Sequence, residues 1–294
     1  MKKASPYYSP DLKIKDPRFS IDDLQDYSLL LQAGEREFQL AVIDTKSNRC
    51  LLLEHYNLFD FSSEEEHQRL IENLFEDHHL LMAGFWHSVR FSVKNLRFSL
   101  IPAALFDKEQ SAAYLRLTSP LPATDSILYY RHLKNSIITV FGAEQRFMEW
   151  LSRRYPNLKI QVIHHISAFT EGVLHSSDHS SGQDVFLLLE NGLLSVLITQ
   201  GNKLQYANLF RCQEPADFLR YLMMVLKQFG LDQTSTKIQL WGNVPPDSPW
   251  FRAVKPYLGN LSFGSRPPFL SFHYMFDEAA DQRFFDLFSL YLCE

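Results

Sequence analysis

The sequence predicts an α/β protein of two lobes, in which mixed β-sheets are flanked by helices. Three observations predict this class. Short apolar runs typical of strands alternate with amphipathic helical stretches, and the same order of elements occurs twice along the chain. The length of 294 residues and the 46% share of hydrophobic residues are sufficient for two separate cores.

The first copy of this order follows a polar arm, predicted over residues 1–27. Apolar runs separated by turn residues predict three consecutive strands at residues 29–32, 37–43 and 51–56. Ser62 and Ser63 precede a run of glutamates and predict a helix start by capping. Apolar residues at helical spacing up to Phe75 predict the buried face of that helix.

Further elements are expected before the second copy begins. The predicted strands lie at residues 89–93, 97–102, 127–132, 136–141 and 158–163, and the predicted helices lie near residues 107–117, 147–151 and 167–174. The first lobe is therefore expected over residues 28–175, with an inserted segment at about 94–125. The serine-rich stretch 176–183 lacks apolar residues and predicts a linker.

The second lobe is expected over residues 184–294. Asn191-Gly192 is a strong two-residue hairpin signal between strands at 185–190 and 193–199. A third strand at 204–207 precedes Glu214-Pro215, which predicts a helix start. The remaining predictions are a strand at 237–241, a helix near 249–257, and a last helix over 277–292 that docks onto the sheet of its own lobe.

A duplicated unit of three meandering strands, helix, strand and helix resembles the actin-like ATPase fold, which is a duplicated ribonuclease H-like fold. Actin, sugar kinases and heat-shock chaperones share it. The tract Phe98 to Phe106, with Tyr114-Leu115 after it, resembles an uncharacterised bacterial family in that fold, a domain of unknown function. The resemblance covers nearly the whole chain as a pattern, and it implies that the first hairpin of each lobe approaches nucleotide phosphates.

Phosphate binding at such a hairpin needs small residues that expose backbone N–H groups and a carboxylate that holds Mg²⁺ through water. The hairpin of the first lobe keeps Gly34, but Gln32 stands where the resemblance implies the carboxylate. Glu35 adds a negative charge where phosphate would bind. The first hairpin is therefore expected to bind phosphate poorly.

The hairpin of the second lobe is closer to the implied pattern. Glu190, Asn191 and Gly192 supply an acid and one glycine, but leucines follow them. The resemblance also implies paired glycines after the fourth strand of this lobe, near the adenosine, and Gly242-Asn243 keeps one of them. With only 11 glycines in the chain, we expect a lost or much weakened ATP and Mg²⁺ site.

Other compositional features exclude or weaken several function classes. The net charge of −5 gives no broad attraction for nucleic acid or an anionic membrane, and no apolar run is long enough to span a bilayer. Three scattered cysteines are typical of a reduced cytoplasmic protein. His175 and His179 could hold a metal, but loop geometry favours solvated side chains, and the chain has no zinc-hydrolase, serine-nucleophile or Walker motif.

The sequence thus predicts a non-catalytic, or weakly nucleotide-binding, module that binds a protein partner and has no bound cofactor. Two alternatives stay open. One is a divergent ATP-binding protein or kinase of the actin-like superfamily, in which Gly34, Glu190 and Gly192 face the phosphates and Mg²⁺, and Gly242 borders the adenine. The other is a structural protein that forms homodimers through an aromatic surface.

Overall fold

The computed structural model describes residues 7–176 and 182–293. The chain folds as two compact units, of which unit 1 holds the residues up to Ala168 together with 269–278 and 286–294, and unit 2 holds 169–268 and 279–285. The boundary therefore lies at Phe169, before the predicted linker, and the C-terminal segment is shared between the units. Of the linker predicted at 176–183, residues 177–181 lie outside the described part of the chain.

The main sheet of unit 1 is mixed, as predicted. Its strands, in spatial order, are β1 (Tyr8–Lys15), β4 (Arg49–Leu58), β3 (Glu37–Asp44), β2 (Tyr27–Ala33), β5 (Ser88–Val93) and β9 (Gln161–His164). The β2–β5 and β5–β9 pairs are parallel and the others are antiparallel. Strand β1 and the 3₁₀ helix Ile21–Asp26 lie in the stretch predicted as a separate arm, so that prediction was wrong. Buried Leu12 and Ile14 alternate with exposed lysines along β1, which is the pattern of a strand.

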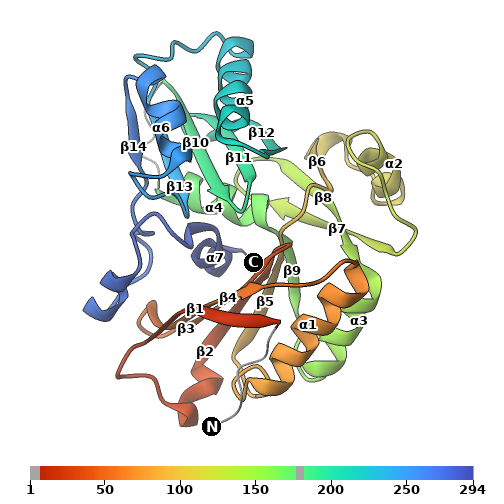
Figure 1. The fold of residues 1–294 in the computed structure, drawn as a ribbon. Helices are drawn as coiled ribbons and strands as arrows, with labels where there is room; N and C mark the ends of the chain where they lie inside the picture. The colour runs from red at the N-terminus through yellow and green to blue at the C-terminus, as the bar shows by residue number, and fades with distance from the viewer. Residues whose placement is uncertain (1–6, 177–181, 294) are drawn as a thin grey trace. The chain divides into compact units, whose positions relative to one another are not determined.

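Two helices cover the apolar face of this sheet, α1 (Glu64–Asp77) and α3 (Gln145–Arg154) (Figure 1). Ser63 caps α1 as predicted, because its hydroxyl accepts a bond from the Glu66 backbone N–H. Phe75 of α1 contacts Phe38 of β3, with ring centroids 5.6 Å apart, and also packs against α3. Aromatic rings thus fill the space between sheet and helices.

The opposite face of the sheet meets the C-terminal segment. That segment contains the 3₁₀ helices Tyr274–Glu278 and Leu290–Leu292 and the short helix α7 (Phe285–Ser289). The predicted single helix over 277–292 is therefore wrong, because the backbone breaks at Phe284, whose φ is +63°. Its last part docks on unit 1 rather than on the second lobe, since Arg90 of β5 donates to the Tyr291 carbonyl at 2.8 Å.

A small antiparallel sheet completes unit 1. Its spatial order is β6 (Phe98–Pro102), β8 (Ile137–Glu144) and β7 (Asp125–His132). The helix α2 (Ser111–Arg116) follows 3₁₀ turns at Ala103–Leu105 and Lys108–Gln110, and it buries Leu115 against Ile138 and Val140. The segment predicted as an insertion at about 94–125 is thus one half of a layer that β7 and β8 complete.

Unit 2 repeats the strand plan of unit 1. Its sheet consists, in spatial order, of β12 (Lys203–Arg211), β11 (Leu193–Gln200), β10 (Gln183–Glu190), β13 (Ile238–Gly242) and β14 (Leu261–Phe263). The order β12-β11-β10-β13 matches β4-β3-β2-β5, which is the duplication that the sequence predicts. Strand β14 is only three residues long and was not predicted.

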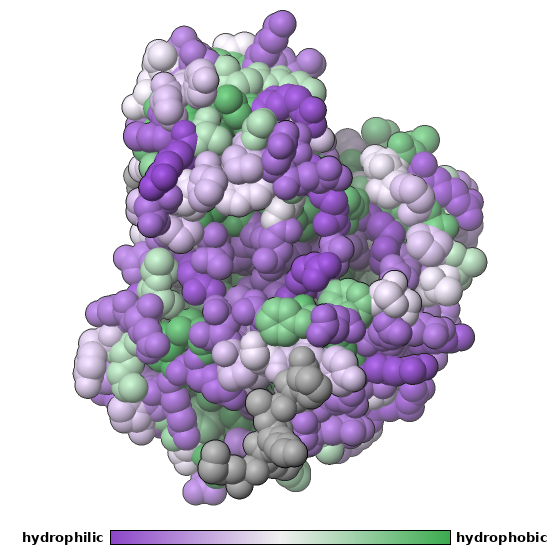
Figure 2. Space-filling model, viewed as in Figure 1, coloured by the Kyte–Doolittle hydropathy of each residue, from purple (hydrophilic) through white to green (hydrophobic). Residues whose placement is uncertain are grey.

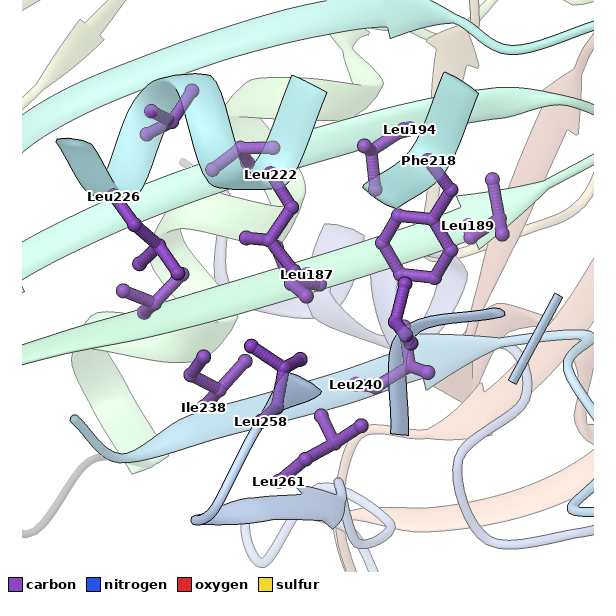
Figure 3. Close-up of a cluster of buried hydrophobic side chains, with 14 of the residues drawn as sticks. Leu187, Leu189, Leu194, Phe218, Leu222, Leu226, Ile238, Leu240, Leu258 and Leu261 are labelled. Carbon is purple, nitrogen blue, oxygen red and sulfur yellow. The ribbon is translucent and has the colours of Figure 1, made fainter. Parts of the chain in front are cut away.

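Helices cover the sheet of unit 2 as well. They are α5 (Pro215–Gln228), α6 (Pro249–Val254) with the 3₁₀ helix Lys255–Tyr257, and α4 (His165–Ser176), which runs from unit 1 into unit 2. Phe218, Leu222 and Leu226 of α5 point toward the leucines of β10 and β13 in the core (Figure 3). No helix of the described residues is long and apolar enough to cross a membrane.

Candidate functional site

The β2–β3 hairpin is the hairpin of the first lobe that the actin-like resemblance places near nucleotide phosphates. The Gly34 N–H donates to the Glu37 carbonyl at 2.9 Å, and the Gly34 carbonyl lies 3.0 Å from His67 Nε2. Both backbone groups of the glycine therefore have partners within the chain. The Glu35 side chain is exposed, so it is not the acid that fills this region.

A buried set of polar and charged side chains lies beside this hairpin. We call it the first-hairpin network, and its members are Gln32, Glu37, Gln39, Lys94 and Asp286. Gln32 Nε2 donates to Asp286 Oδ2 at 2.9 Å and to Gln39 Oε1 at 3.2 Å. Lys94 Nζ lies 2.8 Å from Glu37 Oε1 and 3.4 Å from Asp286 Oδ2. One ammonium group thus serves two buried carboxylates.

Desolvation makes this network strongly interdependent. The side chains of Gln32 and Asp286 are fully buried, and Glu37 is 3% exposed. Burial raises the pKa of the Glu37 carboxyl, but the charge of Lys94 and the hydrogen bonds from His55 and Lys94 outweigh it and hold that pKa at about 2. Charges buried this deeply persist only when they are paired.

The β10–β11 hairpin has a different construction. Asn191 and Gly192 have φ angles of +47° and +74°, the left-handed pair that a two-residue hairpin requires. A Cβ atom on Gly192 would lie 2.6 Å from the Cys212 carbonyl oxygen, so this glycine is needed for the turn itself. Glu190 ends β10 with a side chain that is 4% exposed.

A surface pocket of about 380 Å³ adjoins this second hairpin. It brings together three of the predicted site residues, Asn191, Gly192 and Asn243, with Gln213 and Trp250. The volume is within the range of pockets that hold small molecules. The residues that line the pocket include no lysine, arginine, aspartate or glutamate, so its polar character comes from amide groups.

The backbone geometry explains why a glycine occupies position 242, without reference to an adenine. Its φ is +107°, and a Cβ atom there would lie 2.1 Å from the carbonyl oxygen of Leu189 on the neighbouring strand. Its N–H donates to the Gln282 carbonyl at 2.8 Å, and its own carbonyl accepts from Val244. The glycine therefore permits the close approach of β10 and β13.

The start of helix α5, next to this pocket, is closed by its own side chains. The Asp217 carboxylate accepts hydrogen bonds from the backbone N–H groups of Gln213 and Glu214, at 2.9 and 3.3 Å. Asp217 also lies 2.8 Å from Arg220. The N–H groups that would attract an anion at a helix start are thus partly used within the chain.

The adjacent histidines His164 and His165 have a structural setting in the protein core. His164 and His165 are fully buried at the junction of β9 and α4, and burial lowers the pKa of His164 to about 3. His164 stacks on Phe98 at 5.3 Å. His175 lies in the last turn of α4, whereas His179 lies outside the described residues. Within the described residues, no group of three or more His, Cys, Asp or Glu side chains could hold a metal.

The charged residues beside the first hairpin were not among the site residues predicted from the sequence. Lys94 follows β5 directly, and its backbone N–H donates to the Ala33 carbonyl. A lysine directly after a strand that pairs with β2 was therefore the sequence feature that could have indicated a cation beside the first hairpin. Glu37 has the alternating position of a strand residue, with Gln39 on the same face. Asp286 lies 254 residues from its partner Gln32, and no local pattern predicts that contact.

Comparisons with known proteins agree with this architecture. A crystal structure from Bacteroides thetaiotaomicron, of a protein with actin-like ATPase fold and unknown function, is 17% identical. It matches with a TM-score of 0.78 over 94% of this chain and 99% of that chain. The type IV pilus biogenesis complex PilM–PilN matches at 12% identity and a TM-score of 0.63, over 90% and 97% of the two chains.

The ethanolamine utilization protein EutJ from Carboxydothermus hydrogenoformans is a more distant structural match. It is 8% identical, with a TM-score of 0.51 over 96% of this chain and 93% of that chain. No curated protein sequence matches the chain. At these identities the structures show the fold alone, and that fold is the actin-like ATPase fold that the sequence predicts.

A family model gives the closer classification. It matches residues 16–261, which include the tract from Phe98 to Phe106 that suggested an uncharacterised family. The match begins just after β1 and ends in β14, so it spans the main sheets of both units. The chain is therefore a member of the family described as Protein of unknown function (DUF3822).

Proposed function

We propose that this protein is a non-catalytic binding module of the cytoplasm, which uses the actin-like fold to hold a protein partner rather than to hydrolyse ATP. The observation that carries the proposal is the first-hairpin network. In an active relative, this hairpin would face a nucleotide phosphate, and in this chain Asp286 and Glu37 place two buried carboxylates beside it.

Electrostatics argue against a phosphate beside these groups. A triphosphate would bring several negative charges near two carboxylates that already share the Lys94 ammonium. To release Lys94 for a phosphate would leave Glu37 and Asp286 buried with less compensation, at a cost of several kcal/mol. The Gly34 N–H, the other donor a phosphate would use, is engaged with Glu37 O.

Two further observations support a protein partner in a reducing compartment. The similar structure of PilM is a complex with PilN, so a protein of this fold does bind a protein partner. Cys50, Cys212 and Cys293 are buried thiols that form no disulfide, which suits a compartment that keeps thiols reduced.

The second candidate function is weak nucleotide binding at unit 2 alone. It is favoured by the pocket that joins Asn191, Gly192 and Asn243, where an adenosine could enter. The neutral lining provides nothing to offset phosphate charge, and this is why we rank it second.

Calorimetric titration of the full chain with ATP and Mg²⁺ separates the two functions. We expect no binding tighter than about 1 mM, which corresponds to about −4 kcal/mol. Binding that is tighter, and that disappears in Glu190→Ala but persists in Glu109→Ala, would establish the nucleotide function and overturn the proposal. Glu109 is an exposed glutamate of unit 1 and serves as the matched control.

A further inference from the structure

Strand β7 forms one edge of the small sheet in unit 1. It pairs with β8 over all eight of its residues, from Asp125↔Glu144 to His132↔Ile137, without a shift in register. No strand of the described residues pairs with its outer side. Along an edge strand, alternate backbone N–H and C=O groups point outward, where a further strand can bind them.

The other edges of the sheets carry features that oppose such pairing. Strand β1 has Pro10, an irregular register after it, and two exposed lysines. Strands β9 and β14 are only four and three residues long, and β6 is short and ends at Pro102. Strand β12 is a longer edge of nine residues, but its pairing with β11 shifts in register beside Thr199, and exposed Lys203 and Arg211 lie at its ends. Strand β7 is long and regular and contains no proline, so it lacks these features that oppose the addition of a further strand.

The side chains of β7 are also those of an interface. Ile127, Leu128, Tyr129 and Tyr130 follow one another in the middle of the strand, and Tyr129 is 44% exposed. Apolar residues of the adjoining segments are still more exposed, namely Leu105, Leu117 and Leu133. Figure 2 shows apolar surface over the α2 region of this layer. Exposed apolar clusters of this kind mark binding surfaces.

The charges at the end of β7 indicate what the partner carries. Arg131 and Lys134 are exposed, and neither forms a salt bridge with any described residue. The one carboxylate on β7 itself, that of Asp125, is buried and lies 2.6 Å from Arg97. The basic end of the strand is therefore complementary to an acidic group from outside the chain.

We propose that β7 is a docking strand, to which an extended segment of another protein adds as a fourth strand, with apolar side chains beside Tyr129 and an acidic residue beside Arg131. This inference rests on the proposed function and specifies the surface it uses. A second copy of this chain suits the edge less well. Paired antiparallel, its own β7 offers no carboxylate, because Arg97 already holds Asp125.

The test uses peptides that the intact chain selects. A displayed library of random twelve-residue peptides is selected on the immobilised full chain, and the tightest synthetic peptide is then bound in solution. We expect selected sequences to alternate apolar and polar residues and to contain Asp or Glu. Hydrogen exchange of the complex should show new protection of the amides of residues 125–132.

Two charge reversals make the result specific. Arg131→Glu should weaken binding of the acidic peptide at least about tenfold, whereas Arg116→Glu, an equally exposed cation on α2, should change it less than about twofold. Both side chains are exposed, so neither variant should lower the thermal midpoint.

Other outcomes overturn the docking strand. Protection confined to residues outside 125–132, equal binding by Arg131→Glu, or failure to select any peptide would each reject it. Protection of β7 in the free protein together with a dimer mass would assign the edge to a second copy instead. None of these outcomes restores ATP binding, so the docking strand and the non-catalytic function fail separately.

Discussion

The two hairpins at corresponding places in the duplicated fold differ in what surrounds them. Buried charged side chains lie beside the first hairpin, where Lys94 pairs with both Glu37 and Asp286. The second is shaped by backbone, since Asn191 and Gly192 adopt left-handed angles and a pocket with amide lining lies next to them. A pocket thus lies beside the second hairpin, whereas buried side chains lie beside the first.

The difference between the two hairpins shows that glycines at these positions have structural causes of their own. Gly192 and Gly242 persist because the backbone of unit 2 requires them, and their presence alone does not indicate nucleotide binding. Gly34 has an ordinary φ and is bounded mainly by side chains, so its retention is less constrained. A glycine pattern is thus a weaker guide to phosphate chemistry than the charges around it.

The largest effect is expected from removal of the shared cation. Lys94→Met leaves Glu37 and Asp286 buried without their ammonium partner, and we expect the free energy of unfolding to fall by about 3–5 kcal/mol. Urea denaturation measures this. The control Lys46→Met removes a cation that is 71% exposed and paired with Asp26 at 2.6 Å, and it should leave the free energy of unfolding nearly unchanged. Equal losses would show that the first hairpin is not held by buried charge.

The pH dependence of stability should report the same network. The folded pKa of Glu37 is about 2, below its ordinary value of 4.5, so its contribution is complete above pH 4.5 and is lost as the pH falls toward 2. This difference in the pKa of Glu37 corresponds to on the order of 3 kcal/mol. Between pH 5 and pH 2, the free energy of unfolding measured in urea should therefore fall less steeply with pH in Glu37→Gln than in the unaltered chain. The exposed Glu35→Gln should retain the original slope, and a flattened slope there would contradict the assignment to Glu37.

The smallest difference is expected between the two hairpin glycines. Gly192→Ala forces a left-handed angle on alanine and a contact of 2.6 Å with the Cys212 carbonyl, so it should destabilise by at least about 1–2 kcal/mol. Gly34→Ala meets the Glu37 side chain at 3.0 Å and should cost less. Thermal unfolding of both variants, compared at equal concentration, provides the test. A reversed order would mean that Gly34 is the more constrained turn.

The fold could be predicted from the sequence because its cues are local. The strand runs, the Asn191-Gly192 turn and the Ser63 cap each depend on neighbouring residues, and all appear where they are expected. The edge strand β1 was missed because only two apolar residues, Leu12 and Ile14, alternate clearly within a polar stretch. The end of the chain was misjudged because a helical spacing of apolar residues continues across the break at Phe284.

The candidate site was predictable only in part. Asn191, Gly192 and Asn243 line one pocket, but their role in binding a nucleotide stays a prediction. At the first hairpin, the sequence showed that Gln32 was unsuitable for Mg²⁺, yet it gave no sign of what Gln32 binds instead. That partner, Asp286, comes from a segment whose place is set by tertiary packing alone.

The hydrogen bond between Gln32 and Asp286 can form only after most of the chain has been synthesised. The two residues are separated by 254 positions, and at about 5–20 residues per second the ribosome takes about 13–50 s to pass from one to the other. During that interval Gln32, and Lys94 once it has been made, lack Asp286 as one of their acceptors. The buried network of unit 1 is therefore incomplete until Asp286 has been made, although the strands that carry its other members are made much earlier.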